Sequence, residues 1–464
     1  IGFVMPINSF LYPGAKVTTG YDVDNSCRFN DGDSAQMKKD ATSSDNIVDA
    51  TISMWVKRGV LGTAQVLFAG NYKSNNNYYC SLSFTSGDAL SFKNYDNGTN
   101  CEFITNRLFR DCSAWYYICV ECDLSDSAAD RVKIYINGTT RETSFSTSTN
   151  MSGDQFFLGK SGYEVGVGAL QDGSYFDGYM AEVCYIDGNA AGSPLTPSSF
   201  GEFDEDTPTV FKPIDVSGLS FGANGFYLDF EDSSNLGNDK NGGTDLTESN
   251  LATTDQSTDT CTNNFCTLNP LYNQYADPTF SEGNLKITVG SGWSGAKGTM
   301  GVSTGKWYWE LKLSGTMSSH QHGVQQENVN ESAQNPQNTT GSTSFYNHDG
   351  GEVNTDGSNT SADYGTLDDG DILGIALDMD AGSYGQITFY DNGSAIASNI
   401  NLSSSSTTVM PHLSIDNSTV ECNFGSPPYA ISSGNADGNG YGNFEYSVPS
   451  GYYSLCTKNL AEYG

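Results

Sequence analysis

Apolar and polar residues alternate along several short stretches of the chain, most regularly in three blocks at 305–313, 370–393 and 420–428. In the first block, every second residue from Trp307 onward is apolar, which places these side chains on one face of a strand. The second block repeats the alternation and contains Asn392-Gly393, a dipeptide that favours a type I′ hairpin. The blocks predict antiparallel strands whose core-facing residues are Trp307, Trp309, Leu311, Leu313, Leu373, Ile375, Leu377 and Met379.

A second set of short alternating runs lies between residues 20 and 200. The run 50–59 places Ile52, Met54 and Val56 on one face and Thr51, Ser53 and Trp55 on the other. Further runs follow at intervals, each bounded by Gly, Asn or Asp, and Asn137-Gly138 forms another hairpin signal. Residues 20–200 therefore predict a first antiparallel sandwich.

The remaining segments lack this regularity. Residues 201–275 are polar and rich in Gly, Asn and Asp, and only Phe226, Leu228 and Phe230 alternate as in a strand. We interpret 201–275 as an irregular connector, 276–430 as a second sandwich and 431–464 as a C-terminal segment that docks on it, after an N-terminal segment at 1–19. Helical periodicity is not sustained anywhere, so the predicted fold class is all-β, with two tandem sandwiches.

The chain is strongly acidic, with 55 Asp and Glu against 21 Lys and Arg and a formal charge of −34 over 464 residues. This balance excludes a nucleic-acid partner and docking on anionic lipid, because both depend on cationic contacts. Since the acidic residues are spread over both halves, solubility in salty water is the simpler explanation, and a set of divalent-cation sites such as Ca²⁺ is the alternative. The apolar run near the N-terminus is too short for a signal peptide or membrane insertion.

Eleven cysteines occur without a recurring spacing. Cys119 and Cys122 lie three apart in a strand-like run, so their side chains should point to opposite faces and cannot share a metal ion. Cys261 and Cys266 lie in a predicted loop and could form a disulfide bond. Most of the eleven are expected to be buried free thiols.

Two known domain types resemble these regions. The Gly-Lys-x-Tyr-Trp-Glu opening at 305–310, the Gly-Asp-x-Leu-Gly strand, the Asn-Gly hairpin and the Asn-Phe-Gly close at 423–425 resemble a SPRY domain. The order of strands in 20–200 resembles a concanavalin A-like jelly roll of the laminin-G type. This fold hosts lectins, adhesins and hydrolases alike, so it predicts a fold rather than a reaction.

The whole arrangement resembles a family of tailed-bacteriophage virion proteins, on the strength of 225–239, 262–270 and the closing 449–460 in addition to both domains. The resemblance implies a non-enzymatic fibre or surface appendage on the virion surface or outside the cell. Its implied partners are a host-surface glycan, other virion proteins and further copies of the same chain. The alternatives are a secreted or surface-anchored bacterial adhesin and a jelly-roll polysaccharide hydrolase.

Two groups of residues are candidates for glycan contact. The polar stretch 316–366 interrupts the second sandwich, and we interpret it either as a ligand-binding loop or as a solvated insertion. Amide, carboxylate and ring groups in it could bind sugar hydroxyls and apolar sugar faces. The first group is Tyr346, Asn347, His348 and Asp349, and the second, on hairpins of the first sandwich, is Tyr72, Tyr78 and Tyr95.

Two further groups are candidates for metal or catalytic sites. His320 and His322 should share a strand face, and in a trimer two histidines from each chain could bind one metal ion; the alternative is ordinary polar positions. Glu202, Asp204 and Asp206 alternate as the carboxylates of a glycoside hydrolase would, but prolines flank them and a solvated loop is the simpler interpretation. We therefore predict no enzymatic activity and no cofactor.

Overall fold

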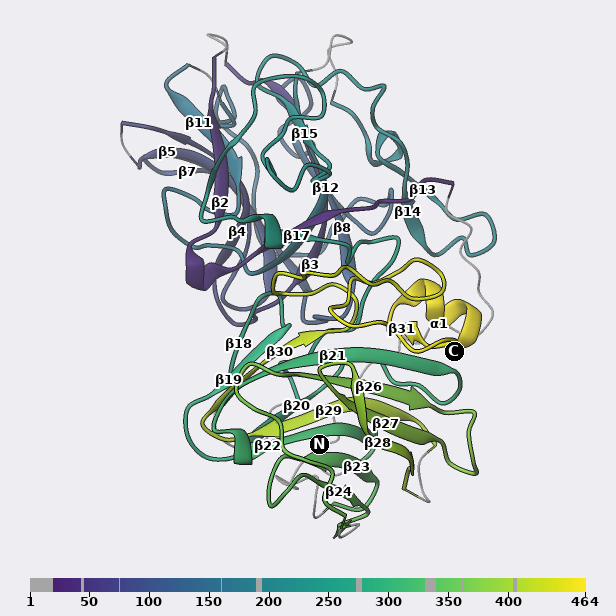
Figure 1. The fold of residues 1–464 in the computed structure, drawn as a ribbon. Coiled ribbons are helices and arrows are strands. Elements are labelled where there is room, and N and C mark those ends of the chain that lie inside the picture. Colours follow the sequence, from purple (N-terminus) through teal and green to yellow (C-terminus); the bar gives the residue numbers. More distant parts are fainter. Residues whose placement is uncertain are drawn as a thin grey trace. The chain divides into compact units, whose positions relative to one another are not determined.

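The computed structural model describes residues 20–42, 46–74, 76–159, 161–188, 194–272, 278–329, 339–359, 362–403 and 407–464. It confirms the predicted all-β fold, and its named strands pair antiparallel except β31, which runs parallel to β21 (Figure 1). The chain divides into two compact units. The first unit is Val17–Thr262, and the second contains Asn263–Gly464.

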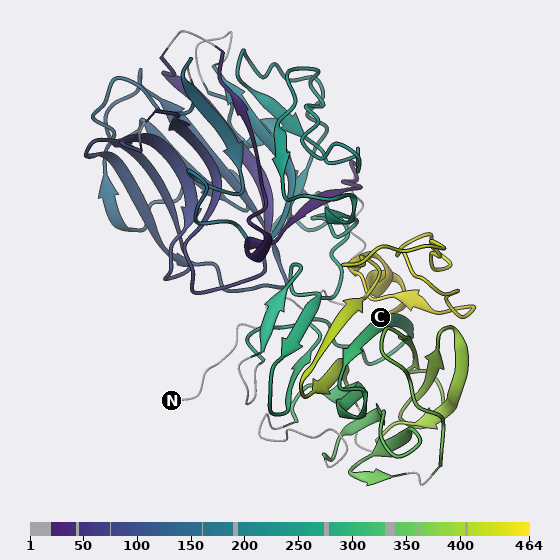
Figure 2. The same ribbon diagram turned by 60° about the vertical axis from the view of Figure 1, so that its left-hand side comes forward.

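Two sheets of described strands face each other in the first unit (Figure 2). The seven-stranded sheet has the order β17 (Gln256–Ser257), β1 (Ser26–Phe29), β12 (Gly178–Asp187), β3 (Asp49–Arg58), β8 (Trp115–Asp123) and β9 (Val132–Ile136), with β15 (Phe226–Leu228) beside β12. The eight-stranded sheet has the order β10 (Phe145–Thr149), β7 (Thr99–Leu108), β6 (Ala89–Asp96), β5 (Tyr78–Phe84), β4 (Gln65–Tyr72), β11 (Tyr163–Val167), β2 (Gln36–Asp40) and β16 (Thr247–Ser249). A separate hairpin joins β13 (Gly201–Phe203) to β14 (Phe211–Pro213), and short 3₁₀ helices cover Asp31–Asp33, Pro197–Ser199 and Thr253–Asp255.

The alternation in β3 sets the register of the first core. Ile52, Met54 and Val56 are fully buried between the two sheets, as predicted. Trp55, on the other face, is also buried, because the outer face of the seven-stranded sheet is covered by later residues. The covering side chains include Phe200, Phe211, Val216, Phe221 and Tyr227.

Cys119 and Cys122 show the same division within β8. Cys119 belongs to the outer apolar cluster and Cys122 to the core between the sheets, so the prediction of opposite faces is confirmed. Since the covering segment and strands β15, β16 and β17 all come from residues 195–262, this part of the polar connector is integral to the first unit.

A buried ion pair fixes the covering segment to the sheet. The ammonium of Lys57 on β3 lies 2.7 Å from Asp259, and each side chain is 1% exposed. The other carboxylate oxygen of Asp259 accepts a hydrogen bond of 3.0 Å from the indole nitrogen of Trp115, and Lys57 also lies over the ring of Tyr179. Each charge therefore has a partner in a region closed to water, as buried charges require.

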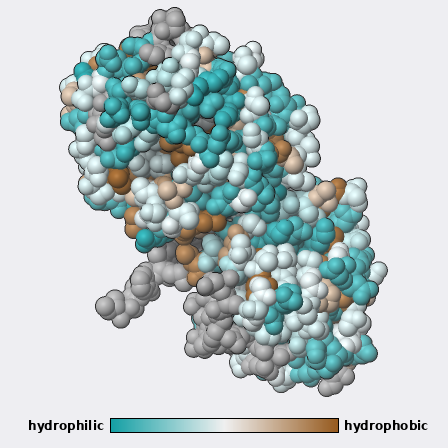
Figure 3. Space-filling model, turned by 90° about the vertical axis from the view of Figure 1, so that its left-hand side faces the viewer, coloured by the Kyte–Doolittle hydropathy of each residue, from teal (hydrophilic) through white to brown (hydrophobic). Residues whose placement is uncertain are grey.

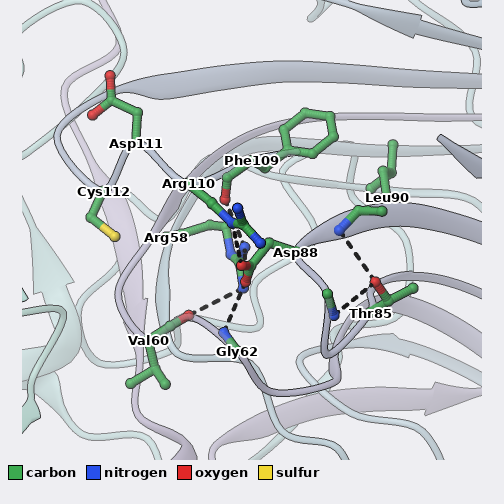
Figure 4. Close-up of polar contacts among 12 residues, drawn as sticks. Arg58, Val60, Gly62, Thr85, Asp88, Leu90, Phe109, Arg110, Asp111 and Cys112 are labelled. Atoms are coloured by element: carbon green, nitrogen blue, oxygen red, sulfur yellow. Dashed lines mark hydrogen bonds and ion pairs between the residues drawn. The ribbon is translucent and has the colours of Figure 1, made fainter. Parts of the chain in front are cut away.

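A second buried cation joins the loops at one end of the first unit (Figure 4). Arg58 is fully buried, and its Nη1 donates to Asp88 at 3.1 Å and to the carbonyl of Phe109 at 2.7 Å. Asp88 also accepts hydrogen bonds from the amide of Gly62 and from Arg110 at 2.8 Å. This arrangement ties the chain after β3 to the β5–β6 turn and to the end of β7.

The second unit contains an eight-stranded and a six-stranded sheet of described strands. The first has the order β18 (Thr279–Ser281), β19 (Lys286–Val289), β30 (Ser418–Asn423), β21 (Lys306–Gly315), β26 (Ile372–Asp378), β27 (Gln386–Asp391) and β28 (Ser394–Asn401), with β31 (Tyr453–Ser454) beside β21. The second has the order β20 (Ser294–Lys297), β29 (Val409–Ile415), β22 (His320–Gln326), β23 (Ser342–Tyr346), β24 (Glu352–Thr355) and β25 (Ser358–Asn359), and a 3₁₀ helix covers Met317–Ser319. Helix α1 is Thr457–Tyr463, and none of the helices in the described ranges has the length and apolar character needed to cross a membrane.

The predicted register of β21 is confirmed. Trp307 and Trp309 are buried in the core of the second unit, with 0% and 1% exposure. The hairpin between β27 and β28 turns at Asn392 and Gly393, whose φ angles of 45° and 80° are those a type I′ turn requires.

The C-terminal segment covers the outer face of the eight-stranded sheet in the second unit. Phe444 packs on Tyr308, and the buried carboxylate of Glu310 accepts hydrogen bonds from the amides of Glu445 and Tyr446 at 2.9 and 2.8 Å. Burial raises the pKa of Glu310, while these amides favour its ionised form. The nominally polar face of β21 is thus closed by the tail.

The interpretation of 316–366 as a loop or solvated insertion is wrong for four segments of that stretch, which form strands. Strands β22, β23, β24 and β25 come from it and build more than half of the six-stranded sheet. Val324, Phe345 and Val353 supply its few core-facing apolar side chains. Small polar residues occupy the other positions, so the stretch lacks the apolar content of an ordinary strand region.

All eleven cysteines are free thiols, as expected for most of them. Ten are buried and Cys261 is half-buried, and the possible pairing of Cys261 with Cys266 does not occur. Burial raises the pKa of Cys101 and of Cys112 to about 12. Thiols of this kind are unreactive at neutral pH.

Replacing Trp309 with Ala should lower the free energy of unfolding of the second unit by about 3–5 kcal/mol, because it leaves a cavity in a closed core. Trp293→Ala is the matched control, since Trp293 is half-exposed, and it should cost less than about 1 kcal/mol. Calorimetric melting of the three proteins measures this difference. Equal transitions for both variants would show that the register of β21 is wrong.

Replacing Asp259 with Ala should lower the free energy of unfolding of the first unit by about 3–5 kcal/mol, because the buried ammonium of Lys57 loses its counter-charge. The double variant Lys57→Met/Asp259→Leu removes both charges and should recover most of the loss. Denaturant titrations of the parent, single and double variants test this. A double variant as unstable as the single one would contradict the role of charge compensation.

Candidate functional site

The outer face of the eight-stranded sheet in the first unit carries two parallel rows of side chains that run across its strands. Cross-strand pairing aligns Glu164 on β11, Asn71 on β4, Tyr79 on β5 and Tyr95 on β6 in one row. The neighbouring row is Gly166, Ala69, Ser81, Lys93 and Glu102. Hydrophilic residues dominate the face of the first unit seen in Figure 3.

Two tyrosines form the aromatic part of this surface. The rings of Tyr79 and Tyr95 stack with their centroids 5.1 Å apart and their planes at 25°, and both are half-buried. Lys93 lies 5.6 Å above the ring of Tyr95 and forms an ion pair with Glu102 at 3.2 Å. The pair therefore presents a ring surface bordered by charged groups.

Polar side chains surround small residues beside the tyrosines. Asn71 donates a hydrogen bond of 3.3 Å to Glu164, which also forms an ion pair with Lys38 at 3.4 Å. These side chains border a shallow recess of about 10 Å³, with Gly166 and Ala69 among the residues that line it. A Cβ on Gly166 would lie 2.2 Å from the carbonyl oxygen of Met37, so the floor of the recess admits only glycine at this position.

The structure separates the three tyrosines that the sequence grouped together. Tyr72 and Tyr78 face inward and pack against the core of the first unit, where both contact other aromatic rings. Tyr95 lies on the outer face. Its partner Tyr79 was missed, because the signal that identifies it is the pairing of β5 with β6 and not a local pattern.

In the second unit, Tyr346 and His348 form a smaller aromatic group together with Trp293. The rings of Tyr346 and His348 stack at 5.0 Å, and Trp293 meets Tyr346 edge-on at 6.1 Å. Asp349 is largely exposed and lies 3.2 Å from His348. Trp293 did not emerge from the sequence, since it lies far away along the chain.

Asn347 has a structural role in this segment. It is 2% exposed, and its amide group donates to the carbonyls of Met317 and Leu367 and accepts from the amide of Leu367. These hydrogen bonds leave it no free contact with a ligand. Of the four residues proposed from the sequence, Tyr346, His348 and Asp349 remain on the surface.

His320 and His322 do share a strand face, but they point into the protein. Both are fully buried, and Nδ1 of His320 lies 3.1 Å from Nε2 of His322. Burial lowers the pKa of His320 to about 4 and that of His322 well below its ordinary value, so both rings are neutral. A metal site shared between chains would need ring nitrogens at the surface, and no group of three or more metal-binding side chains occurs in the described ranges.

Glu202, Asp204 and Asp206, the candidate hydrolytic carboxylates, lie on and after β13. Lys212 on β14 forms ion pairs with Glu202 at 3.5 Å and with Asp204 at 3.4 Å. Asp204 also accepts hydrogen bonds from the amides of Asp206 and Thr207, which fixes the turn. The geometry here is that of a stabilised hairpin.

Comparison with known proteins assigns the two units to domain classes. Residues 29–188 match the concanavalin A-like lectin/glucanases superfamily, and residues 306–427 match the SPRY domain. The chain thus carries one domain of each class, and such domains suggest carbohydrate or protein binding. No curated protein matches the chain.

Several solved structures resemble parts of the chain. The SPRY domain of human HERC1 is 18% identical, and the match covers 33% of this chain and 96% of that chain at a TM-score of 0.28. The PSpry domain of TRIM65 is 13% identical, covering 34% and 88% at a TM-score of 0.28. The heptameric SAP-like pentraxin from Limulus polyphemus is 15% identical, covering 36% and 78% at a TM-score of 0.28.

The second unit should lose stability as the pH falls below about 6.5. Protons then bind histidines of the unfolded chain, whereas buried His320 resists protonation until about pH 4. This difference in pKa lowers the free energy of unfolding by about 3 kcal/mol at low pH. The double variant His320→Leu/His322→Leu removes both buried imidazoles and should show a flatter pH profile. Melting of the parent and variant between pH 4 and 8 tests this, and identical profiles would contradict it.

Proposed function

We propose that this protein is a non-enzymatic adhesion protein that binds glycans through the outer face of the eight-stranded sheet in its first unit. The observation that carries the proposal is the row formed by Glu164, Asn71, Tyr79 and Tyr95 across four adjacent strands. The match of this unit to a superfamily that includes lectins supports it.

The row offers the chemical groups that a saccharide requires. The stacked rings of Tyr79 and Tyr95 provide an apolar surface for the C–H face of a sugar. The amide of Asn71 and the carboxylate of Glu164 can donate to and accept from hydroxyl groups. The small residues of the neighbouring row keep the surface low beside the rings, so that an extended chain of sugars can lie along it.

Short-range contacts must supply the affinity. The formal charge of −34 opposes approach to an anionic cell surface, but this repulsion is screened beyond ~8 Å at physiological ionic strength. A single shallow site of this kind binds weakly, so several copies held together provide useful attachment. The group formed by Tyr346, His348 and Trp293 in the second unit is a second contact of the same type.

The setting we propose is a fibre or surface appendage of a tailed-bacteriophage virion. The motifs at 225–239, 262–270 and 449–460 are the basis for this setting, and they imply assembly with other virion proteins and with further copies of the chain. The ligand in that setting is a glycan of the host surface. A bacterial surface adhesin with the same glycan-binding face is the alternative setting, and mass spectrometry of purified virions separates the two.

Replacing Tyr95 or Tyr79 with Ala should weaken glycan binding at least tenfold, because each variant loses one of the two stacked rings. A tenfold loss of affinity corresponds to about 1.4 kcal/mol of binding free energy. The measurement is binding of bead-clustered protein to a glycan array at increasing NaCl. Tyr72→Ala is the matched control, since its ring lies on the inner face of the same sheet and should affect stability instead. Tyr346→Ala should reduce binding by a smaller factor.

Binding that persists at high salt and fails in both outer-face variants supports the proposal. Binding that disappears with added salt contradicts the short-range contacts. Undiminished binding by Tyr79→Ala and Tyr95→Ala contradicts the location, and release of reducing sugar during the assay contradicts the absence of catalysis.

A further inference from the structure

A cavity of about 210 Å³ opens on the first unit beside the bulge of β12, on the side opposite the stacked tyrosines. Glu182 lies in that bulge, between Ala181 and Cys184, where the pairing with β3 is interrupted. Its φ angle of 49° is unfavourable for a residue with a side chain, so the fold holds this carboxylate in place against backbone strain.

Two tyrosines hold one oxygen of this carboxylate. Oε2 of Glu182 accepts hydrogen bonds from Tyr227 at 2.9 Å and Tyr21 at 3.4 Å. Oε1 receives no hydrogen bond from any residue in the described ranges. Glu182 is only 6% exposed and lines the cavity, so Oε1 is an acceptor available to a molecule bound there.

The cavity walls concentrate negative charge. Asp24 and Asp215 are exposed and line it, and neither forms an ion pair with a described residue. Asp229 and Glu231 line it as well, and they hold the ammonium of Lys240, which lies 2.9 Å from Asp229. The contact with Lys240 thus shows that carboxylates of this wall can bind an alkyl ammonium group.

We propose that this cavity binds a small aliphatic amine, whose ammonium group contacts the free oxygen of Glu182 and the carboxylate of Asp215. The volume accommodates a short carbon chain, which is larger than a bare ion. The carboxylates do not converge as the ligands of a metal ion would, since the described residues contain no group of metal-binding geometry. The rings of Tyr21 and Tyr227 provide apolar surface for the carbon chain.

Binding should be coupled to the ionisation of Glu182. Burial, together with the nearby charges of Asp229 and Asp215, raises its pKa to about 7, against the hydrogen bonds of the two tyrosines. An ammonium group favours the ionised carboxylate, so the amine should bind more tightly above pH 7 and release a proton as it binds.

The test uses 1,5-diaminopentane, which stays charged throughout, and its neutral counterpart 1,5-pentanediol, with the full chain in a calorimeter at pH 5.5 and 8.5. We expect the diamine alone to bind, about tenfold more tightly at pH 8.5 than at pH 5.5. Glu182→Gln should weaken binding about tenfold at pH 8.5 and abolish its pH dependence. Asp215→Asn should weaken it at both pH values.

Glu205→Gln is the matched control, because Glu205 is exposed outside the cavity and its replacement removes the same charge. It should leave binding unchanged, and near-ultraviolet circular dichroism verifies that each variant is folded. Equal binding of the diol, no binding of the diamine, or equal weakening by Glu205→Gln would overturn the proposal. So would displacement of the diamine by an equimolar concentration of Ca²⁺, which would indicate a metal site.

Discussion

The buried ion pair between Lys57 and Asp259 determines how the first unit is built. Lys57 occupies an outward-facing position of β3, where an isolated sheet would expose it to water. The segment that brings Asp259 also brings the apolar side chains that cover Trp55 and Tyr117. Because the ammonium can remain buried only with its counter-charge present, the segment and the sheet depend on each other. In the second unit, buried Glu310 and the C-terminal segment depend on each other in the same way, with two backbone amides in place of a charged partner.

The covering segment of the first unit determines which of its surfaces are available for a ligand. The outer face of its seven-stranded sheet is closed by residues 195–262, except where the bulge at Glu182 leaves a cavity. Among the residues that the structure describes, none forms such an apolar cover over the outer face of the eight-stranded sheet, and its half-buried tyrosines and charged side chains reach the surface. The two candidate sites thus lie on opposite sides of one sandwich, and their chemistry differs. One presents rings and amides, and the other presents carboxylates around a hollow.

The sequence was sufficient for the fold class and for strand register wherever apolar residues alternate with polar ones. Trp307, Ile52 and the pair Cys119 and Cys122 all have the faces that alternation predicts. It was insufficient for 316–366, because a strand whose neighbours supply most of the core needs few apolar residues of its own. It was also insufficient for the sites. Tyr79 joins Tyr95 only through strand pairing, and Glu182 becomes distinctive only through a bulge and through residues distant along the chain, such as Tyr21 and Tyr227.

The two sites differ in the part that charge plays in binding. Contacts of a sugar with the rings of Tyr79 and Tyr95 involve no net charge, so dissolved salt changes them little. The carboxylates around Glu182 attract cations, but the cavity excludes part of the solvent that would screen them, and a buried carboxylate remains a strong acceptor. A chain with a formal charge of −34 could attract cations over its whole surface. The cavity therefore differs from the rest of the surface in its geometry. Its carboxylate is held against backbone strain beside two tyrosines, so it discriminates between cations by shape. Diffuse surface charge cannot do this.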